Sequence, residues 1–446
     1  MEHDDVVVIG SGIAGLVAAT TAARAGATVR LLDARRAPGG RARSHEEAGF
    51  LCNEGPHALY RGGEAQEVFD RLGLQLSGGD PNRGTVAHGL RSDDSLVPLP
   101  AAPAALLRSR WLGLRGKVSL GRLLGGIGRV DPAPLAGVSM GAWLDDRISD
   151  PDARALVGAV TRVATYVADA ESISADAAIT QLQRGLSSGV RYIDGGWASI
   201  VDGLLGAARD AGVTIELGTS VQAVAPDGIG RWTVSTAAGP RRASAVVLAA
   251  GGPAHAASVA GHAAPVLHRW AEAAVPVTAS HLDVGLPGGW TAMPVVFGLG
   301  RPLYLSLHAP VAARLAPAGG ALVSTMRNHH AGESTDAADD RTELEALLER
   351  VRPGWRDDAT VVRFGARRVV AHDRPTPERG GLVGRPAAEV PGTAGLYVAG
   401  DWVGPHGMLA DAAASSGEAA GTQAATASAA AAGVASNHRQ RAKMAP

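Results

Sequence analysis

The stretch Val6–Gly15, VVVIGSGIAG, determines the fold of this chain. It begins with four β-branched residues, a composition typical of a parallel strand that is buried on both faces. Gly10, Gly12 and Gly15 follow in the spacing G-x-G-x-x-G. Gly10 permits a tight turn, Gly12 lets the backbone approach a pyrophosphate, and Gly15 lets a helix pack closely on the strand. The pattern predicts a strand, a phosphate-binding turn and a helix in direct succession.

The residues after this turn complete a dinucleotide-binding unit. Leu16–Ala25 is a run of small and apolar residues suited to a buried helix, and Thr28–Leu32 is a second strand that ends at Asp33. An acidic residue at that point accepts hydrogen bonds from the ribose hydroxyls of the nucleotide. We therefore expect this part of the cofactor site to consist of Gly10, Gly12, Ile13, Ala14, Gly15, Asp33, Ala34 and Arg35.

The overall composition excludes several classes of protein. The chain has 446 residues, with 42 Lys+Arg against 43 Asp+Glu, so it offers no surface that would neutralise nucleic-acid phosphates. The single cysteine, Cys52, excludes an internal disulfide and a cysteine zinc site, and we predict no metal site. No window reaches the roughly 20 apolar residues of a membrane-spanning helix, and the acidic start MEHDD is unlike a signal peptide. We expect a cytoplasmic protein.

Four further motifs stand in order along the chain: GGRARS at 39–44, EGP at 54–56, GLYVAGD at 395–401 and ASSGEAA at 414–420. Together with the GSGIAG turn, they resemble the superfamily of flavin-dependent amine oxidases, phytoene desaturases and protoporphyrinogen oxidases. The resemblance reaches both ends of the chain and implies FAD as the cofactor. The FAD would be bound non-covalently, because the C-terminal region has no cysteine that could attach it.

The resemblance also implies a role for individual residues. Beyond the first turn, the implied cofactor-binding residues are Gly40, Arg41, Gly55, Pro56, His57, Val221, Gly400, Asp401, Met408, Leu409 and Ala410. Among them, Asp401 would bind the ribityl or phosphate part of FAD. The start of the C-terminal helix would lie beneath the flavin pyrimidine, where its positive end stabilises negative charge. His57 and His406 are the candidate acid–base residues, and a solvated or structural histidine is the alternative for both.

Two departures from the superfamily bear on the reaction. Its amine oxidases usually carry a lysine near flavin N5, but this chain has no lysine between Lys117 and Lys443. They also tend to carry an aromatic residue in the motif that begins the C-terminal helix, where this chain has Leu409, or Met408 if the register shifts by one. The aromatic contact to an ammonium group is therefore missing. Both departures favour dehydrogenation of a neutral, apolar substrate over amine oxidation.

The expected fold class is α/β. A Rossmann-like FAD-binding domain of the glutathione-reductase type would be assembled from residues 1–95, 187–265 and 380–432. An α+β substrate-binding domain, with a mixed or antiparallel sheet and a helical roof, would comprise residues 96–186 and 266–379. Residues 433–446 lose periodicity and become polar and basic, so we expect a disordered tail.

The substrate-binding domain offers few specific signals. Leu96–Ala136 is rich in Pro, Leu and Arg, and we expect it to wall the substrate channel; contact with a membrane surface is the alternative. Tyr304 and His308 share one face of a predicted strand and are candidate substrate contacts. Arg327 could bind a substrate carboxylate or could instead pair with a surface acid.

The sequence thus predicts an FAD-dependent dehydrogenase that desaturates an apolar or polycyclic small molecule, a reaction suited to secondary metabolism. The alternatives are an amine or amide oxidase, a redox-neutral isomerase that uses reduced FAD, and a non-catalytic FAD-binding protein. No second G-x-G-x-x-G motif stands in a suitable context, so we expect oxygen or a quinone as the electron acceptor. Nothing in the sequence specifies an oligomeric state.

Overall fold

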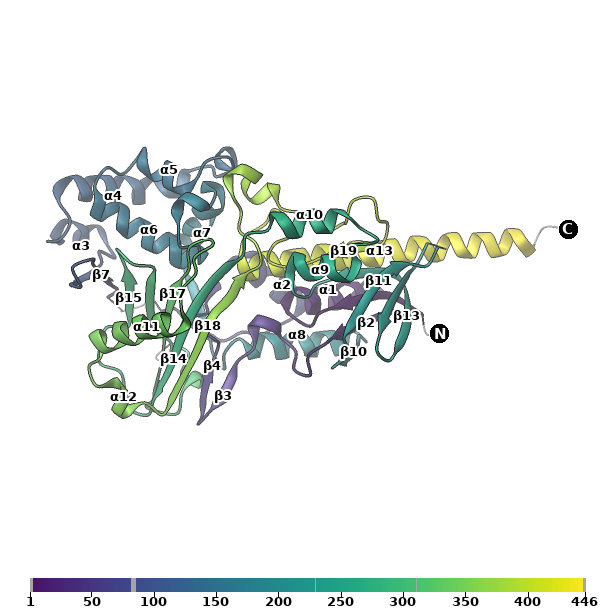
Figure 1. Cartoon of the computed structure of the whole chain (residues 1–446), viewed down its shortest axis with the longest axis horizontal. Helices are drawn as coiled ribbons and strands as arrows, with labels where there is room; N and C mark the ends of the chain where they lie inside the picture. Colours follow the sequence, from purple (N-terminus) through teal and green to yellow (C-terminus); the bar gives the residue numbers. More distant parts are fainter. Residues whose placement is uncertain (1–2, 82–85, 229, 310, 444–446) are drawn as a thin grey trace.

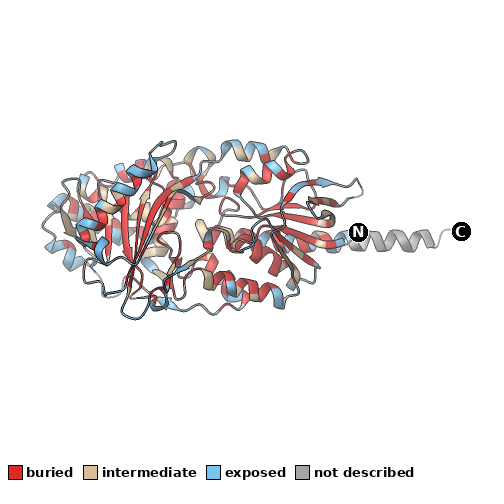
Figure 2. Cartoon of the chain, turned by 60° about the horizontal axis from the view of Figure 1, so that its bottom comes forward, coloured by how far each residue is buried: buried red, intermediate tan, exposed pale blue. Residues whose placement is uncertain are grey.

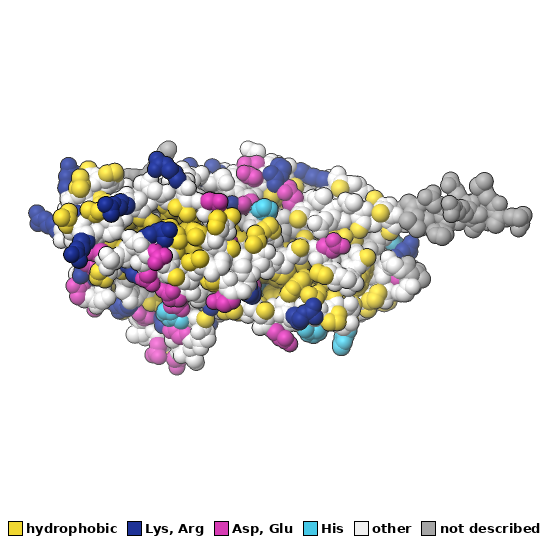
Figure 3. All heavy atoms as spheres, turned by 90° about the horizontal axis from the view of Figure 1, so that it is seen from above, with side chains coloured by type: hydrophobic (Ala, Val, Ile, Leu, Met, Phe, Trp, Pro, Cys, Tyr) yellow, Lys and Arg dark blue, Asp and Glu magenta, His cyan; other side chains and the backbone are white. Residues whose placement is uncertain are grey.

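Two seven-stranded sheets organise the chain (Figure 1). The structure is a computed structural model that describes residues 3–81, 86–228, 230–309 and 311–443, with the backbone alone for 432–443. The two sheets lie toward opposite ends of the molecule (Figure 1), which is elongated (Figure 3). Their strands are largely buried, and the exposed residues lie on the outer sides of the helices (Figure 2).

The first sheet carries the glycine-rich turn. Its strands are β1 (His3–Ile9), β2 (Val29–Asp33), β10 (Thr214–Leu217), β11 (Val221–Pro226), β12 (Trp232–Thr236), β13 (Gly239–Leu248) and β19 (Leu396–Val398). The order is β10-β2-β1-β13-β12-β11, and β19 also pairs with β13. The pairs among β10, β2, β1, β13 and β19 are parallel, whereas β11, β12 and β13 form an antiparallel meander. Val6, Val7 and Val8 are fully buried, as expected for a strand covered on both faces.

Helices cover this sheet. They are α1 (Ile13–Arg24), α2 (Glu64–Leu72), α8 (Ala198–Asp210), α9 (Gly252–Ala260), α10 (Val266–Ala273) and α13 (Leu409–Lys443). The crossing of α1 and α13 is very close, because a Cβ at Gly417 or Gly421 would lie 2.4 Å from the carbonyl oxygen of Ala14 or Ala18. Glycine at these two positions lets the backbones touch and thereby places the start of α13.

The second sheet is mainly antiparallel. Its strands are β7 (His88–Leu90), β8 (Leu96–Pro98), β14 (Val277–Leu286), β15 (Val295–Gly298), β16 (Leu303–Leu307), β17 (Ala321–Asn328) and β18 (Val361–Ala371). The order is β18-β14-β17-β16-β15-β7-β8, with a single parallel pair between β7 and β15. Leu282, Val284 and Leu305 point to one face, which packs on α11 (Ala337–Val351) and α12 (Trp355–Asp358). Alternate residues point to the opposite face, which we call the inner face.

A helical layer stands at one end of the second sheet (Figure 1). It comprises α3 (Pro103–Arg108), α4 (Leu114–Gly126), α5 (Met140–Asp145), α6 (Pro151–Thr165) and α7 (Ala175–Ser187). Short strands connect the two halves: β3 (His45–Glu47) with β4 (Phe50–Cys52), and β9 (Val190–Ile193) with β5 (Leu59–Tyr60) and β6 (Gly78–Gly79). The helical layer has an apolar core of its own, which reaches Met408 at the start of α13.

The single strand β18 contains a left-handed residue, Arg367 (φ 45°), within its length. Other elements differ from the sequence expectations. β7 belongs to the second sheet although it precedes residue 96, where the substrate-binding domain was expected to begin. Residues 433–443, expected to be disordered, are instead part of α13, which continues to Lys443 because the alanine run before residue 433 favours helix. Residues 444–446 lie outside the described part of the chain.

Candidate functional site

The glycine-rich turn has the geometry that its motif predicts. Gly10 has φ 110°, and a Cβ there would lie 2.7 Å from the carbonyl oxygen of Ala249 on the neighbouring strand segment. A Cβ at Gly15 would lie 1.8 Å from the carbonyl oxygen of Gly10. No side chain fits at either position, so these two glycines are required for α1 to pack on β1.

Gly12 stands at the N-terminus of α1, and a Cβ there would meet no atom within 4 Å. The N-cap has no side-chain hydrogen bond, and Gly39 bridges to Gly12 from the following loop. Gly40 also approaches closely, with its Cβ position 3.5 Å from the Gly12 Cα. Backbone from two glycine-rich segments thus borders an open space at a helix N-terminus, and this cradle fits a pyrophosphate. Ile13 and Ala14 form the first helical turn beside it.

Asp33 lies at the end of β2, beside the glycine-rich turn. Its Oδ2 accepts hydrogen bonds from the backbone N–H (2.7 Å) and hydroxyl (2.6 Å) of Ser11, and its Oδ1 accepts one from the N–H of Arg35 (2.7 Å). The carbonyl oxygen of Asp33 accepts a hydrogen bond from Thr219, two residues before Val221 at the start of β11. Asp33, Ala34, Arg35 and Val221, predicted for the adenosine end of the cofactor, are therefore neighbours.

Arg41 and Asp401 meet across the chain. Arg41 Nη1 lies 2.7 Å from Asp401 Oδ2, and His372 contacts both carboxylate oxygens, through its backbone N–H (3.1 Å) and its Nδ1 (3.0 Å). Burial alone would raise the pKa of Asp401, but the charge of Arg41 and the contact with His372 hold it well below its usual range. Asp401 is therefore ionised, and it holds a guanidinium group close to the glycine cradle.

The EGP turn is anchored by a carboxylate from the second sheet. Glu54 and Gly55 both have positive φ, 58° and 101°, and the N–H of Gly55 donates to Asp283 Oδ2 at 3.0 Å. Asp283 is 1% exposed and also accepts a hydrogen bond from Ser324 at 2.6 Å. The carbonyl oxygen of Pro56 accepts a hydrogen bond from the Tyr166 hydroxyl at 2.6 Å. The turn is thus fixed by side chains from the second sheet and from the helical layer.

A group of histidines and tyrosines lies between this turn and the inner face. His57 Nδ1 is 3.1 Å from the carbonyl oxygen of Gly55, and its ring packs edge-on against Trp197 at 5.1 Å. His308 stacks on Tyr192 with ring centroids 4.1 Å apart. Tyr304 is buried nearby and interacts with Tyr192 through the hydroxyl groups. The prediction that Tyr304 and His308 share a face holds, and that face is the inner face.

The histidines of this group are neutral at pH 7. Burial lowers the pKa of His57 and lowers the pKa of His308 to about 4. His308 Nε2 lies 2.8 Å from the hydroxyl of Ser306, so the ring keeps a polar partner without gaining a proton. Neutral imidazoles can accept a proton or orient a polar group, and the inner face is therefore a candidate wall of the substrate site.

This lowered pKa makes a prediction about stability. His308 titrates near 6.5 when unfolded and about 4 when folded, so it stabilises the fold above pH 6.5 and loses that contribution as the pH falls toward 4. When the pH falls from 7.5 to 5, the free energy of unfolding of the wild type should drop by about 2 kcal/mol more than that of His308→Gln, because the variant has no buried imidazole to protonate. Denaturant titrations at both pH values measure this difference. The exposed His262→Gln variant is the control, and parallel pH curves for His308→Gln and wild type would contradict the prediction.

The start of α13 combines an unusual backbone conformation with buried charges. Leu409 has φ 55°, a left-handed conformation that costs about 1–2 kcal/mol for a residue with a Cβ. Arg385, 7% exposed, donates to the carbonyl oxygens of Gly407 (2.8 Å) and Asp401 (3.2 Å) and so holds the preceding turn. Burial raises the pKa of Asp411 to about 6, although Arg184 lies 2.9 Å from it. Such strained, charged turns are typical of functional sites.

The remaining predicted residues of this region divide into two groups. Met408 is 3% exposed and packs in the apolar core of the helical layer, and Ala410 and Leu409 are half-buried next to it. His406 is exposed, and its backbone carbonyl oxygen accepts a hydrogen bond from the Arg385 guanidinium group at 3.4 Å. Among the described contacts, none joins the side chain of His406 to the group of histidines and tyrosines, so we retain His57 as the acid–base candidate.

Arg327 is not available to a substrate. It lies on the α11 side of β17, where it forms ion pairs with Asp340 (3.3 Å) and Glu343 (2.7 Å). Ser280 Oγ and His329 Nε2 both bond Asp340 Oδ2, at 2.6 and 2.8 Å. Ser280, His329 and Asp340 are at most 3% exposed. This buried network therefore attaches α11 to the sheet rather than forming a reactive site.

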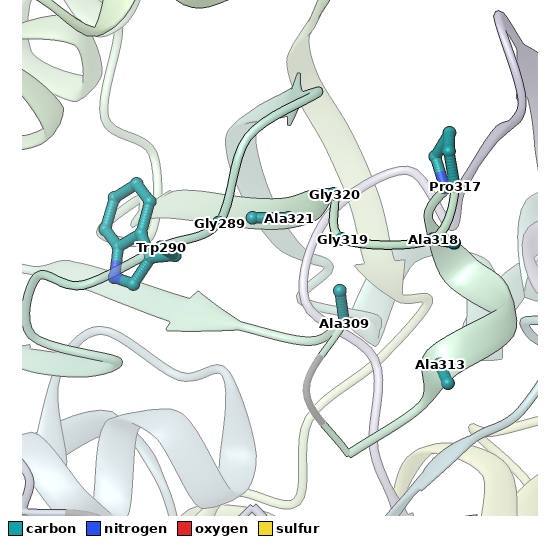
Figure 4. Close-up of a pocket in the computed structure, with 9 residues that line it drawn as sticks. All are labelled: Gly289, Trp290, Ala309, Ala313, Pro317, Ala318, Gly319, Gly320 and Ala321. Atoms are coloured by element: carbon teal, nitrogen blue, oxygen red, sulfur yellow. The ribbon is translucent and has the colours of Figure 1, made fainter.

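A surface hollow of about 360 Å³ lies beside the second sheet (Figure 4). Its lining residues are Gly289, Trp290, Ala309, Ala313, Pro317, Ala318, Gly319, Gly320 and Ala321. This lining has no titratable side chain and includes none of the residues described above. The hollow therefore supplies no chemistry to the candidate site.

Sequence reasoning missed several residues that shape the site, among them Asp283, Arg385, Asp411, His372 and Tyr192. Asp283 had a signal, because it interrupts the apolar residues of SHLDVGL in a strand that is otherwise buried. Arg385 and Asp411 had none, since their partners are backbone carbonyls and an arginine far away in the sequence.

Comparison with known proteins identifies the family. The sequence profile of the flavin containing amine oxidoreductases matches residues 13–423. The chain belongs to this family. It is an FAD-dependent oxidoreductase, and the open glycine cradle at the N-terminus of α1, with the guanidinium group of Arg41 close to it, suits the pyrophosphate of that cofactor.

Its relatives carry out different reactions. Coproporphyrinogen III oxidase of Propionibacterium freudenreichii is 27% identical over 430 residues, which covers 79% of this chain and 77% of that protein. Hydroxyneurosporene desaturase of Cereibacter sphaeroides is 45% identical over 67 residues, so the match spans 13% of the desaturase. The structure of putrescine oxidase bound to putrescine has a TM-score of 0.71 at 16% identity, covering 94% of this chain and 98% of that one. The comparisons therefore specify the fold and the flavin chemistry but not the substrate.

Proposed function

We propose that this family member dehydrogenates a neutral, apolar or polycyclic small molecule by hydride transfer to FAD. The observation that carries the proposal is the start of α13, where Met408 and Leu409 pack into the apolar core of the helical layer. A site for an ammonium group would need an aromatic cage or a free carboxylate. The motif that begins α13, residues 407–411, has no aromatic residue. The carboxylate of Asp411 in this motif is bound by Arg184 and the N–H of Ala65.

We infer that the cofactor is held non-covalently along the first sheet. The residues that would hold it are Gly10, Gly12, Ile13, Ala14, Gly15, Asp33, Ala34, Arg35, Gly40, Arg41, Val221, Gly400 and Asp401. When bound, FAD supplies the acceptor for a hydride. Arg41 would neutralise phosphate charge, and the N-terminus of α13 would favour negative charge at the flavin pyrimidine. The EGP turn, fixed by Asp283, would position the substrate side of the ring.

His57 is the residue that we propose to accept the substrate proton. Its Nδ1 faces the carbonyl oxygen of Gly55, which favours the tautomer with the hydrogen on Nδ1 and a free lone pair on Nε2. Because burial lowers its pKa, the ring is neutral and ready to accept a proton at pH 7. His308 and Tyr304 on the inner face, together with Tyr192 of β9, would orient a polar group of the substrate and exclude water.

An anaerobic titration of the purified holoprotein tests this proposal. We expect the oxidised flavin absorbance to bleach with polyenes or polycyclic compounds and not with primary amines. His57→Gln should slow bleaching about a hundredfold without changing the amount of bound FAD, since a positioned base contributes at least that factor. Bleaching by amines alone would favour the amine oxidase alternative. No bleaching by any class, together with conversion of a substrate without an acceptor, would favour an isomerase.

The electron acceptor can be identified in the same preparation. We propose oxygen or a quinone, because the sequence has no second dinucleotide motif. Hydrogen peroxide formed in proportion to product would identify oxygen, whereas turnover only after addition of a quinone would identify the latter. Reoxidation that requires a pyridine nucleotide would contradict this part of the proposal.

A further inference from the structure

The segment that forms α3 and α4 has an unusual charge. Residues 96–130 contain five arginines and one lysine but no acidic residue, in a chain whose net charge is −1. Among the described residues, none of these six side chains forms an ion pair with a carboxylate; Lys117, for example, donates to the carbonyl oxygen of Leu107 at 2.8 Å. The carboxylate of Asp150 lies close to Gly116, on the buried side of α4. The positive charge of this segment is therefore uncompensated.

The same segment exposes large apolar side chains. Leu107 is 73% exposed and Leu114 is 80% exposed, and Val118 and Leu124 are also exposed. Leu107 belongs to α3, and the other three residues belong to α4. Where Figure 1 places these two helices, Figure 3 shows Lys and Arg side chains next to exposed hydrophobic ones. We call Leu107, Leu114, Arg115, Val118, Arg122 and Leu124 the α3–α4 surface.

The arrangement on α4 is that of a helix with two apolar faces. Gly116, Leu120 and Leu123 are buried and face the helical layer. Leu114 and Val118, one turn apart, lie on the opposite side. At 100° per residue, Arg115 and Arg122 flank this outer stripe on one side, and Lys117 flanks it on the other. An outward apolar stripe bordered by cations is typical of helices that lie in the interface of a bilayer.

We propose that the α3–α4 surface binds the headgroup region of an anionic lipid bilayer, with the leucines inserted and the arginines against lipid phosphates. No helix of the described chain is long and apolar enough to cross a membrane, so the contact is peripheral. A protein partner would need an apolar groove bordered by acidic residues. An anionic bilayer already combines negatively charged headgroups with an apolar interior. The apolar core behind this surface continues from Leu120 and Leu123 to Met408. It thus joins the membrane side to the residue that we place beneath the flavin.

This inference goes beyond the proposed function, and it deepens that proposal in one respect. If the substrate dissolves in the bilayer, it would enter through the helical layer and reach the flavin without passing through water. Membrane binding itself does not depend on the identity of the substrate, so the two proposals fail separately.

Co-sedimentation of the full-length holoprotein with vesicles tests the surface. The vesicles are phosphatidylcholine alone or phosphatidylcholine with one third phosphatidylglycerol, and flavin absorbance in the pellet reports folded protein. We expect binding to the anionic vesicles that weakens in high salt. Arg115→Gln with Arg122→Gln should reduce the partition coefficient about 25-fold, since each cation near an anionic surface contributes about fivefold. Leu107→Ser with Leu114→Ser should reduce it by at least as much.

Matched variants elsewhere make the test specific. Arg209→Gln with Arg269→Gln removes two exposed arginines from the other half of the molecule, and Val383→Ser removes a side chain that is 73% exposed. Both variants should bind like the wild type. Equal binding of the surface variants and the wild type, or no binding to either vesicle, would overturn the proposal. So would a wild-type dimer in solution that becomes monomeric in Leu114→Ser and does not bind vesicles, because the surface would then join two copies of this chain.

Discussion

Replacing Gly12 by aspartate is expected to abolish FAD binding without unfolding the protein. A Cβ at Gly12 meets no atom within 4 Å, and its φ of −75° suits any residue, so the folded chain tolerates the side chain. The new carboxylate would occupy the space that we assign to the pyrophosphate, at the N-terminus of α1. Two like charges about 4 Å apart repel by about 4 kcal/mol at the effective dielectric constant near a protein surface. We expect the affinity for FAD to fall by a factor of about 100 or more.

The control for this variant is Gly206→Asp on α8. It adds the same carboxylate at a glycine whose Cβ position also meets no atom within 4 Å, and it should bind FAD like the wild type. The flavin-to-protein absorbance ratio measures binding, and circular dichroism of both variants verifies folding. A Gly12→Asp protein that is purified with a full complement of FAD would disprove our placement of the pyrophosphate.

Replacing Gly417 by leucine is expected to have the largest effect on stability. A Cβ at this position would lie 2.4 Å from the carbonyl oxygen of Ala14, which is part of the backbone and cannot rotate away. Overpacking of a well-packed contact costs about 1–3 kcal/mol, and here α13 must move off α1, so we expect a loss of about 3 kcal/mol or more in unfolding free energy. Urea unfolding of the apoprotein measures this loss.

The same substitution should also weaken FAD binding. Ser416, the preceding residue, donates to the carbonyl oxygen of Gly400 and accepts from its N–H, at 3.0 and 2.9 Å. A displaced α13 therefore pulls on the loop that carries Asp401. Gln423→Leu, on the exposed side of the same helix, adds an apolar side chain of similar size and should change neither property. A stable Gly417→Leu protein with normal FAD content would show that the α1–α13 contact is not required.

Local patterns were sufficient for the nucleotide-binding half of the fold. The close contact of Gly15 with the carbonyl oxygen of Gly10 spans five residues, and the spacing of the glycines predicts the strand, turn and helix that the structure contains. The alternation of residues likewise placed Tyr304 and His308 on one face of a strand segment of the second sheet. The strand β18 keeps its pairing with β14 on both sides of the left-handed residue Arg367, a conformation that no local pattern indicates.

The candidate site required more than local patterns. Asp283 holds Gly55 from 228 positions further along the chain, and Arg385 bonds backbone carbonyls, which every residue possesses. Neither contact leaves a periodicity or a motif in the sequence. The same holds for Arg327, whose choice between a substrate and an acid partner depends on which side of β17 faces α11.

The sequence by itself determined the dinucleotide-binding unit, the family and the flavin, because backbone sterics and helix-terminus charge depend on residues that are close together in the chain. Only the tertiary structure decided which histidine lies against the EGP turn, that Arg327 is paired, and that the arginines and leucines of α3 and α4 share one open surface. Those outcomes depend on burial and on partners brought together by packing. The free energy of such contacts is set by distances in space, and the order of residues does not specify them.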